Sequence, residues 1–557
     1  MGIDFIQNVG LLGFINYPSL FTPYVYQLKI LLNLLIISAF AINLKLVGLK
    51  NNDYFYLLFF SAIFLTEWDS FLYILFLILL LKNYSIDEAI EININYFIIT
   101  PLCISLLILA KLTFLFISIL IFFLYFISGG IYNIGRIVLV LLYLSVIYYL
   151  NNIEIESIIL QLKNIYAFTS GYNSAMALSD SYMLLVPVVL LYSFFNIFII
   201  YSLSKFENIN YYKIIFILIL FYIIWKHSIV RSDHLLILLQ CILFFILYTY
   251  LKYRSKVNIV FQYFLIFTIT LCVICMQLTN GNLISSLYES KNRILDNLSS
   301  LISFNKNYEE NIFEFQLNSI IPRDKFNKCI ILNGGPNKFA YWGYIPHHVI
   351  LNKNLLTNKI PVSFTGWNEY TKSKSVEFIT NNVELLVVDY KSIDNNYLYL
   401  DDSLTQIEIV NNFKYLKKCG RSEIFIRNQN NNKIHFSIIN KSKIKLNTNI
   451  ELPTVNSNEL LVAEIKINQS YLNILRSFIY KPVQYNLVLD NKYEYKFNLE
   501  SSKSNFIMGI PETFEAKNSL DFYNINYPNY FMFKCNSSLI FCNSDLEIII
   551  KKGIKNK

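Results

Sequence analysis

The chain has 557 residues, of which 55% are hydrophobic and 17% aromatic, and its mean hydropathy of +0.43 is too high for an ordinary soluble protein. The formal net charge of +9 is spread along the chain without a basic stripe or an alternation of basic and aromatic residues, which argues against nucleic acid as a partner. Charged residues are sparse before about residue 280 and frequent after it. We therefore expect a multi-spanning membrane domain in residues 1–282, followed by a polar domain.

Long apolar runs follow one another through the first half of the chain. They cover residues 28–46, 54–82, 97–128, 134–150, 183–202, 212–229, 234–251 and 258–279. Run 54–82 is interrupted by Thr66–Ser70 and run 97–128 by Lys111, and the resulting halves are short for a bilayer that needs about 20 residues. Each of these two runs therefore suggests a broken or re-entrant pair, which predicts an α-helical polytopic domain with about 8–10 membrane helices.

The distribution of lysine and arginine predicts the orientation of the helices. If the spans alternate, one side holds Lys45, Lys50, Lys82, Arg136, Lys205, Lys213, Lys252, Arg254 and Lys256. This side is predicted to be cytoplasmic, because loops rich in Lys and Arg remain inside. The same alternation puts the loop 151–182, the segment 226–234 and residues 283–557 outside, and it adds Glu67, Asp69 and Lys111 if the broken runs dip outward. Polar groups would then converge on the outer face.

Residues 222–236 are unusually rich in ionisable side chains. They place Lys226, His227, Arg231, Asp233 and His234 between two apolar runs. Helical spacing would put Lys226, Asp233 and His234 near one face, with Arg231 close enough for an anionic ligand to meet two cations. Ionisable residues at membrane depth are costly and usually functional, so the pattern predicts a phosphate site. The alternative is an interfacial loop whose cations reach lipid headgroups.

The loop 151–182 contains a small-residue turn, Thr169–Met176, with Gly171 and Tyr172 at its centre. Such a turn is typical of the start of a re-entrant or interfacial helix. A role for Tyr172 in ligand binding is the alternative, and the residues alone leave both open.

The polar domain is expected to consist of two external parts. Residues 283–420 mix strand-like runs (Lys328–Leu332 and Val383–Asp389) with helical stretches (Ser373–Thr380 and Leu404–Phe413), which is an α/β pattern. Residues 421–557 instead hold short alternating segments separated by turn residues, as in a β-sandwich. These segments are Glu423–Arg427, Lys433–Ile439, Leu460–Ile467, Tyr485–Leu489, Tyr493–Leu499 and Leu546–Lys551.

The cysteines show no zinc-binding spacing. Cys535 and Cys542 could form a disulfide across a hairpin if their domain faces an oxidising compartment. No cluster of residues has metal-ligand spacing, so the acidic side chains could recruit a divalent cation only with help from a substrate phosphate. The sequence therefore predicts no dedicated metal site.

Several short motifs occur in a particular order along the chain. G-Y-x-x-A-M at Gly171–Met176 is followed by K-x-x-x-V-R-x-D-H at Lys226–His234, and then by P-V-x-F at Pro361–Phe364, with Glu369–Thr371 and Ile393–Asn395 further on. This order resembles a large, mostly uncharacterised family of polytopic bacterial membrane proteins, whose layout is similar to that of the GT-C glycosyltransferases. In that family a residue usually separates the Asp from the His, whereas Asp233 and His234 are adjacent here.

The resemblance implies an enzyme that moves a sugar from a polyprenyl-phosphate carrier to a glycan or lipid acceptor, on the outer face of the bacterial cytoplasmic membrane. GT-C enzymes use an acidic residue of the first outward loop as general base, a position that Glu67 and Asp69 would occupy. A carboxylate suits this task because it can take the proton of an acceptor hydroxyl close to the reacting carbon. Lys226 and Arg231 would hold the departing phosphate.

Other functions remain open at this point. Glu67 and Asp69 could instead line a helix break and bind Lys111 structurally, because carboxylates within membranes usually find a cationic partner. The protein could also be an O-antigen polymerase or ligase, which uses outward basic residues without a catalytic carboxylate, or a non-catalytic assembly protein whose β-sandwich binds a glycan. A transporter is disfavoured, because the sequence shows no internal repeat with paired broken helices.

Overall fold

The computed structural model shows an apolar helical part followed by a β-rich part. It describes residues 36–38, 40–45, 49–64, 68–81, 94–110, 113–128, 131–150, 182–206, 211–230, 234–256, 258–280, 338–343, 355–356, 368–389, 396–419, 422–428, 434–456, 458–467, 471–510, 525–535 and 546–554, and a few isolated residues. Residues 8–158 and 180–305 form one compact unit, the helical unit, and residues 1–7, 159–179 and 306–557 form the other, the β-rich unit. The predicted order of a helical and a β-containing part is confirmed.

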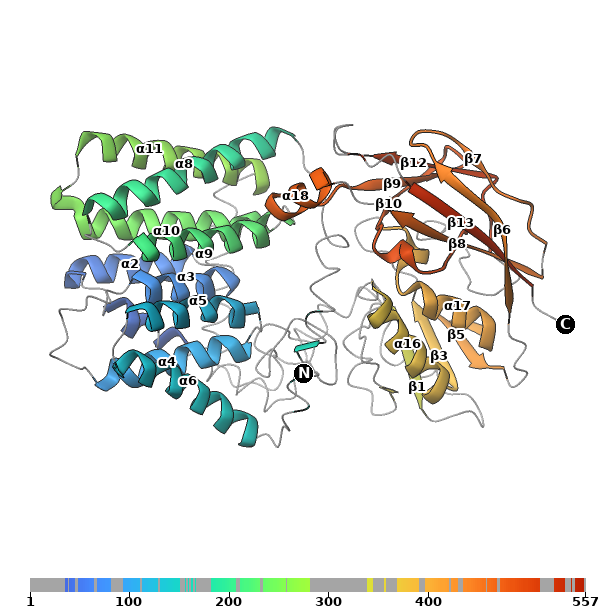
Figure 1. Cartoon of the computed structure of the whole chain (residues 1–557), viewed down its shortest axis with the longest axis horizontal. Coiled ribbons are helices and arrows are strands. Elements are labelled where there is room, and N and C mark those ends of the chain that lie inside the picture. Colours follow the sequence, from blue (N-terminus) through green and yellow to red (C-terminus); the bar gives the residue numbers. More distant parts are fainter. Residues whose placement is uncertain are drawn as a thin grey trace. The chain divides into compact units, whose positions relative to one another are not determined.

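The helical unit consists of apolar helices that coincide with the predicted runs to within a few residues (Figure 1). They are α2 (Asn51–Phe64), α3 (Trp68–Leu81), α4 (Ile94–Ala110), α5 (Thr113–Ser128), α6 (Ile131–Leu150), α8 (Tyr182–Phe206), α9 (Tyr211–Val230), α10 (Leu235–Tyr253) and α11 (Ile259–Asn280). The two interrupted runs each form two separate helices, α2 with α3 and α4 with α5. The interruptions at Thr66–Ser70 and at Lys111 therefore mark helix ends, as predicted.

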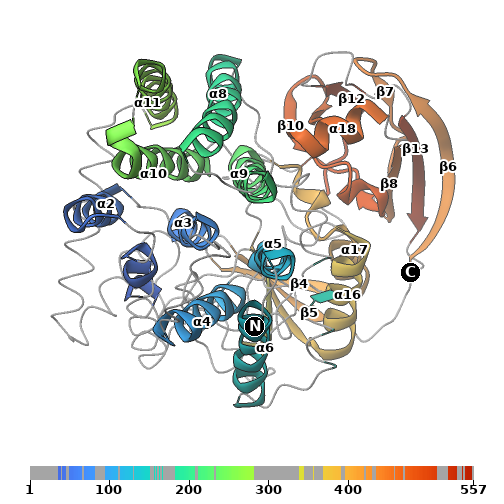
Figure 2. The same ribbon diagram turned by 60° about the vertical axis from the view of Figure 1, so that its left-hand side comes forward.

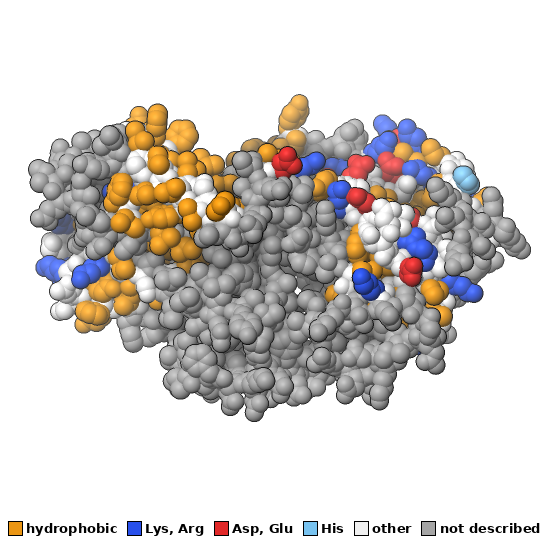
Figure 3. Space-filling view, turned by 90° about the horizontal axis from the view of Figure 1, so that it is seen from below, with side chains coloured by type: hydrophobic (Ala, Val, Ile, Leu, Met, Phe, Trp, Pro, Cys, Tyr) orange, Lys and Arg blue, Asp and Glu red, His pale blue; other side chains and the backbone are white. Residues whose placement is uncertain are grey.

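Some of these helices are long enough to cross a membrane. Within the described residues, the spans that combine sufficient length and apolarity are Val186–Lys205, Tyr211–Ile229 and Leu235–Lys256, while Asp69–Leu81, Thr100–Leu109, Ile134–Tyr149 and Ile259–Cys275 are apolar but shorter. Outer helices expose apolar side chains such as Leu141, Ile200 and Ile266. Figure 3 shows such hydrophobic side chains gathered on the left, where Figure 1 places the helices. A surface of this kind suits contact with lipid.

Helix α10 lies at the centre of the helical unit, where it packs against α2, α3, α9 and α11. Its side chains Leu238, Phe244 and Phe245 have no exposed surface, and the ring of Phe245 lies edge-on to those of Phe195 and Phe221 from α8 and α9. Aromatic pairs of this geometry add to the energy of burial. Helix α10 therefore fixes its neighbours, including the ends of α3 and α9.

The first layer of the β-rich unit is a five-stranded sheet. Its order is β2 (Leu355–Leu356), β1 (Phe339–Trp342), β3 (Leu385–Asp389), β5 (Ser422–Arg427) and β4 (Phe413–Cys419). Strand β1 pairs in parallel with β2 and β3, whereas β5 is antiparallel to β3 and β4. Helices α16 (Glu369–Asn382) and α17 (Ser403–Asn412) pack against each other beside the sheet (Figure 2). This part is α/β, as predicted.

Strand β5 corrects one detail of the sequence analysis, which assigned Glu423–Arg427 to the β-sandwich. The strand belongs to the α/β sheet, because it forms a tight hairpin with β4 and pairs along its length with β3. The expected division after residue 420 therefore falls inside the connection of a hairpin. Residues Lys328–Leu332, predicted as another strand, lie outside the described residues.

The second layer is a sandwich of two four-stranded antiparallel sheets. One sheet has the order β10 (Tyr493–Phe497), β9 (Tyr485–Leu489), β12 (Tyr530–Cys535) and β7 (Ile450–Glu451), and the other β11 (Phe506–Ile507), β8 (Glu459–Ile467), β13 (Leu546–Ile554) and β6 (His435–Ile444). Alternation of buried and exposed side chains, as at Phe531 and Phe533, directs one face of each strand inward. Buried residues of both sheets and of the five-stranded sheet form one continuous core.

Two further features of the sandwich concern its connections. Cys535 and Cys542 form a disulfide, which confirms the pairing that the sequence suggested. A short helix, α18 (Tyr471–Ile479), lies between β8 and β9, where the sequence analysis expected only a connection.

Candidate functional site

The helical unit brings together acidic, aromatic and imidazole side chains from three helices. Asp69 lies in the first turn of α3, and Tyr73 follows it one turn later on the same face. His227 lies in the last turn of α9. Its Nε2 atom is 3.7 Å from Oδ2 of Asp69, and its Nδ1 atom is 3.1 Å from the hydroxyl of Tyr73. We call Asp69, Tyr73, His227 and the neighbouring His234 the Asp69 cluster.

The packing of α3 and α9 explains why these groups meet. The two helices are antiparallel, because the ammonium of Lys213 at the start of α9 donates to the backbone oxygen of Leu81 at the end of α3, 3.3 Å away. The first turn of α3 therefore lies beside the last turn of α9. A helix start favours the carboxylate of Asp69, and a helix end favours a cationic His227.

The hydrogen-bonding capacity of His227 fits this arrangement in one way. An ionised carboxylate only accepts hydrogen bonds, so the Nε2 atom of His227 would carry the proton that faces Asp69. The Nδ1 atom can then accept from the hydroxyl of Tyr73, which is buried and packs edge-on to Phe114. The side chains of Asp69 and His227 keep 22% and 19% of their surface exposed, so the pair is accessible from one side.

The structure places part of the predicted site around this pair. His234 precedes the first turn of α10, and its ring lies 5.4 Å from that of His227 in a T-shaped arrangement. Lys226 is the neighbour of His227 in α9 and is half-buried. Asp69 and His234, from the 226–234 segment, are therefore both placed beside His227. Glu67, Lys111, Tyr172, Arg231 and Asp233 lie outside the described residues.

Two members of the Asp69 cluster were not assigned a role from the sequence. Tyr73 stands inside a continuous apolar run, but its spacing of four residues from Asp69 is the signal that could have identified it. His227 was counted among the ionisable residues of segment 222–236, yet only its neighbours were given roles. Its contact with Asp69 depends on the packing of α3 against α9, which no local pattern shows.

A different charged group lies at the opposite end of α10. Arg254, directly after this helix, forms an ion pair of 3.3 Å with Asp53 in the first turn of α2. The side chain of Asp53 is almost fully buried. Helix α10 has 19 residues, so His234 and Arg254 at its two ends are separated by roughly 28 Å. This separation is close to the thickness of the hydrocarbon core of a bilayer, about 30 Å. The Asp69 cluster and the basic Lys252–Lys256 segment therefore lie at opposite ends of α10, separated by about the thickness of this hydrocarbon core.

The β-rich unit contains a second group of buried charges. The ammonium of Lys372 in α16 has no exposed surface and donates to the hydroxyl of Ser403, 2.8 Å away, and to the backbone oxygen of Ser501. Asp401 and Asp402 precede α17 and are also buried. Burial lowers the pKa of Lys372 to about 8, and it raises the pKa of Asp401 to about 8 and that of Asp402 to about 7.

Local geometry distinguishes Asp402 within this group. It adopts a left-handed backbone conformation with φ of 47°, which costs a non-glycine residue roughly 1–3 kcal/mol. One carboxylate oxygen accepts a hydrogen bond from the indole of Trp342 at 3.4 Å. The contacts of Lys372 and Asp402 thus connect α16, the start of α17, strand β1 and the turn at Ser501. We interpret the group as a buried polar network that holds these segments together.

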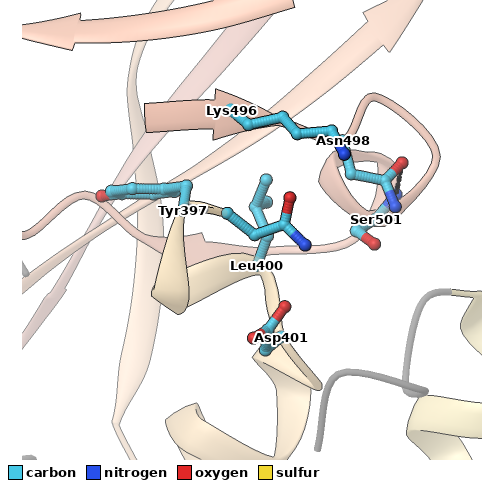
Figure 4. Close-up of a pocket in the computed structure, with 7 residues that line it drawn as sticks. Tyr397, Leu400, Asp401, Lys496, Asn498 and Ser501 are labelled. Atoms are coloured by element: carbon cyan, nitrogen blue, oxygen red, sulfur yellow. Dashed lines mark hydrogen bonds between the residues drawn. The ribbon is translucent and has the colours of Figure 1, made fainter. Parts of the chain in front are cut away.

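The cavities near these charges are of different kinds. A small cavity of about 10 Å³, the size of one water molecule, is lined by residues that include Asp401, Lys496, Asn498 and Ser501. Figure 4 shows these side chains. A wider cleft of about 440 Å³ is lined by Glu369, Leu404, Glu464, Glu500, Lys503, Ser504 and Asn505. Among the described residues, no three His, Cys, Asp or Glu side chains are placed to hold a metal ion.

Comparison with known proteins gives little further information. No protein-family model and no curated protein matches this sequence. Among solved structures, the chain is similar to the archaeal oligosaccharyltransferase AglB from Archaeoglobus fulgidus, determined in complex with an inhibitory peptide and a dolichol-phosphate. The TM-score is 0.31 at 12% identity, and the match covers 75% of this chain and 63% of that one, less than two thirds of its length. A likeness this weak establishes neither a common fold nor a common activity.

Proposed function

We propose that the protein is a membrane glycosyltransferase of the GT-C kind, which transfers a sugar from a polyprenyl-phosphate carrier to a glycan or lipid acceptor at the outer face of the bacterial cytoplasmic membrane. The observation that carries the proposal is the placement of Asp69 beside His227, at the opposite end of α10 from the basic Lys252–Lys256 segment. A carboxylate and two imidazoles at membrane depth are costly to maintain, and such groups usually serve a function.

In the proposed reaction, Asp69 acts as general base. Its carboxylate takes the proton of the acceptor hydroxyl while the acceptor oxygen bonds to the anomeric carbon of the sugar, and the bond between that carbon and the carrier phosphate breaks. The carrier leaves as a lipid phosphate that keeps the electron pair of this bond. Lys226, together with Arg231, would stabilise the growing negative charge on that phosphate.

His227 would have a positioning role in this reaction. Its contact with Asp69 holds the carboxylate at the end of α3, and the hydrogen bond with Tyr73 fixes the imidazole ring. A polar acceptor could approach from the side on which Asp69 and His227 are exposed. A divalent cation would need donor oxygens from the substrate phosphate in addition to those of the protein.

The proposal is tested by removing the charge of Asp69 without changing its shape. Asp69→Asn in proteoliposomes should abolish sugar transfer and preserve binding of a polyprenyl-phosphate sugar, because the amide cannot accept a proton. The matched control is Asp53→Asn, which removes the carboxylate that pairs with Arg254 at the opposite end of α10. This control should lower stability and leave transfer per folded molecule intact.

Three further variants distinguish the two candidate acids and test the phosphate-binding role of Arg231. Glu67→Gln decides whether Glu67 rather than Asp69 is the base, and full transfer by both amide variants would eliminate a carboxylate base and favour a polymerase or ligase mechanism. Arg231→Lys should already impair carrier binding, because an ammonium cannot reproduce a two-pronged guanidinium contact. Arg231→Ala should weaken it by about 1.5–3 kcal/mol. Undiminished carrier binding by Arg231→Ala would favour an interfacial loop at 226–234.

The proposed organisation places residues 1–282 in the membrane and residues 283–557, with the α/β sheet and the sandwich, outside it. The disulfide between Cys535 and Cys542 supports an oxidising location for the β-rich unit, since disulfides are rare in the cytosol. The continuous core of that unit supports its folding without the helices. Residues 283–557 expressed alone should show a mixed α and β circular dichroism signal with a cooperative melt. An aggregated fragment would contradict this organisation.

A further inference from the structure

Helix α18 in the β-rich unit has its polar and apolar faces reversed relative to an ordinary surface helix. Its exposed side chains are Tyr471, Leu472, Ile474, Leu475, Phe478 and Ile479, and Tyr471 is 92% exposed. Its buried residue is Asn473, at 7% exposure. A helix that packs on a soluble core normally buries its apolar stripe and exposes its polar residues. Here the apolar stripe faces outward.

The spacing of the two residue classes shows that this reversal is continuous along the helix. At 100° per residue, the six apolar side chains cover an arc of roughly 160°, and Asn473, Arg476, Ser477 and Tyr480 share the opposite side. Helix α18 begins after β8 and ends just before β9, so the sandwich holds it at both ends. It is therefore a short amphipathic helix presented on a rigid support, and not a loose terminal segment.

The residues beside the apolar face are those found at a lipid headgroup region. The guanidinium of Arg476 lies 5.7 Å from the ring centre of Tyr480, and the ammonium of Lys481 lies 6.0 Å from the same centre. Tyrosine and basic residues next to an apolar face are typical of helices that lie in the membrane interface. From residue 465 to residue 489 the sequence contains no acidic residue, and its accessible basic side chains are Lys466 and Arg476, because Lys481 is only 3% exposed. This charge complements an anionic lipid surface.

Because the helical unit belongs to the same chain, α18 is held close to any membrane that this unit spans. The same polypeptide contains spans that are long and apolar enough to cross a bilayer, so the β-rich unit is tethered to it at high effective concentration. We propose that α18 is an interfacial helix that docks the β-rich unit onto the lipid surface, with its apolar face among the upper acyl chains and Arg476 among the headgroups. This inference does not depend on the transferase activity.

The test places an environment-sensitive fluorescent amino acid at Phe478 of the full-length protein, in nanodiscs containing phosphatidylglycerol. The matched control is the same probe at Ile438 in β6, because both side chains are 63% exposed and belong to the same unit. Lipids with a spin label near the top of the acyl chain quench only probes that enter the bilayer. We expect a blue-shifted emission at Phe478 with at least twofold stronger quenching than at Ile438.

Two additional measurements make the outcome decisive. Arg476→Glu should reduce quenching at Phe478 in phosphatidylglycerol and have a smaller effect in neutral phosphatidylcholine, because it reverses the charge at the headgroups. Equal quenching at Phe478 and Ile438 would overturn the proposal. A blue shift without lipid quenching would also overturn it, since the apolar face would then be covered by protein, either another part of the chain or a second copy.

Discussion

Replacing Lys372 by methionine should destabilise the β-rich unit far more than the same change two residues away. Lys372→Met removes a fully buried ammonium and its hydrogen bonds to Ser403 and Ser501, and it leaves Asp401 and Asp402 without their cation. Breaking a buried charge group by removing one partner costs about 3–5 kcal/mol.

Lys374→Met is the matched control on the same helix. Lys374 forms an exposed pair with Glu377 at 2.7 Å, one turn away in α16. Such surface pairs contribute only about 0.2–0.5 kcal/mol. The two variants therefore differ in burial and partners while sharing the same chemical change, and a general effect of losing one lysine would be equal in both.

The cost of Lys372→Met should also depend on pH. Burial raises the pKa of Asp402 to about 7 and that of Asp401 to about 8, so both carboxyl groups bind protons in the folded protein at pH 6 and lose them as the pH approaches 8. In the unfolded chain they are already ionised throughout this interval, so the stability gained from protonation is lost as the pH rises through 7 and 8. Without the cation of Lys372, this loss should be larger, and the variant should be weakest at pH 8.

Hydrogen exchange measured by mass spectrometry on the full-length protein in nanodiscs would check this reasoning. Peptides from α17 should exchange faster in Lys372→Met than in the wild type, by a factor that grows between pH 6 and pH 8 after correction for intrinsic exchange. Peptides from α10 serve as an internal reference. Equal protection of α17 in Lys372→Met and Lys374→Met, or a cost that is the same at both pH values, would refute the argument.

Three further outcomes follow from the contacts described above. Tyr73→Phe keeps the packing against Phe114 but removes the hydroxyl that contacts His227, so sugar transfer should fall about fivefold for a loss of about 1 kcal/mol, whereas Tyr248→Phe at the far end of α10 should not change it. Replacing Cys535 and Cys542 by serine should destabilise the β-rich unit by roughly 2–3 kcal/mol in thermal unfolding, because the disulfide closes a short loop. In intact cells, a membrane-impermeant thiol reagent should label Asn456→Cys and not Ser255→Cys, both of which are exposed sites, and the reverse pattern would invert the topology.

Much of the fold was accessible from the sequence because apolar periodicity decides it. The helices of the membrane part and strands such as β9 and β13 lie where the pattern predicted them. Strand β12 was missed although Phe531 and Phe533 alternate with less buried residues, because the run is short and lies between Asn529 and Asn536. Helix α18 was missed because its apolar residues resemble another short alternating segment of the sandwich.

The candidate site was predictable only in part, since it depends on packing between distant segments. The sequence indicated Asp69 by its position at a helix break, and it indicated segment 226–234 by its density of charge. That His227 is the residue facing Asp69 follows from the antiparallel contact of α3 and α9, which Lys213 and Leu81 fix at the other end. The buried group around Lys372 gave no signal, because its members are isolated polar residues in an amphipathic helix and a turn.

The hairpin formed by β4 and β5 has a consequence for how the external region could be divided or exchanged. The sequence patterns place a domain boundary after residue 420, which is in the connection between β4 and β5. Strand β5 nevertheless pairs with β4 on one side and with β3 on the other, and the cores of the α/β layer and the sandwich are continuous. A protease cut at residues 420–421 should therefore leave two pieces that stay associated until denaturant is added. Recombination at the same point would separate each half from strands it needs, so the α/β layer and the sandwich are expected to be inherited, and to unfold, as a single piece.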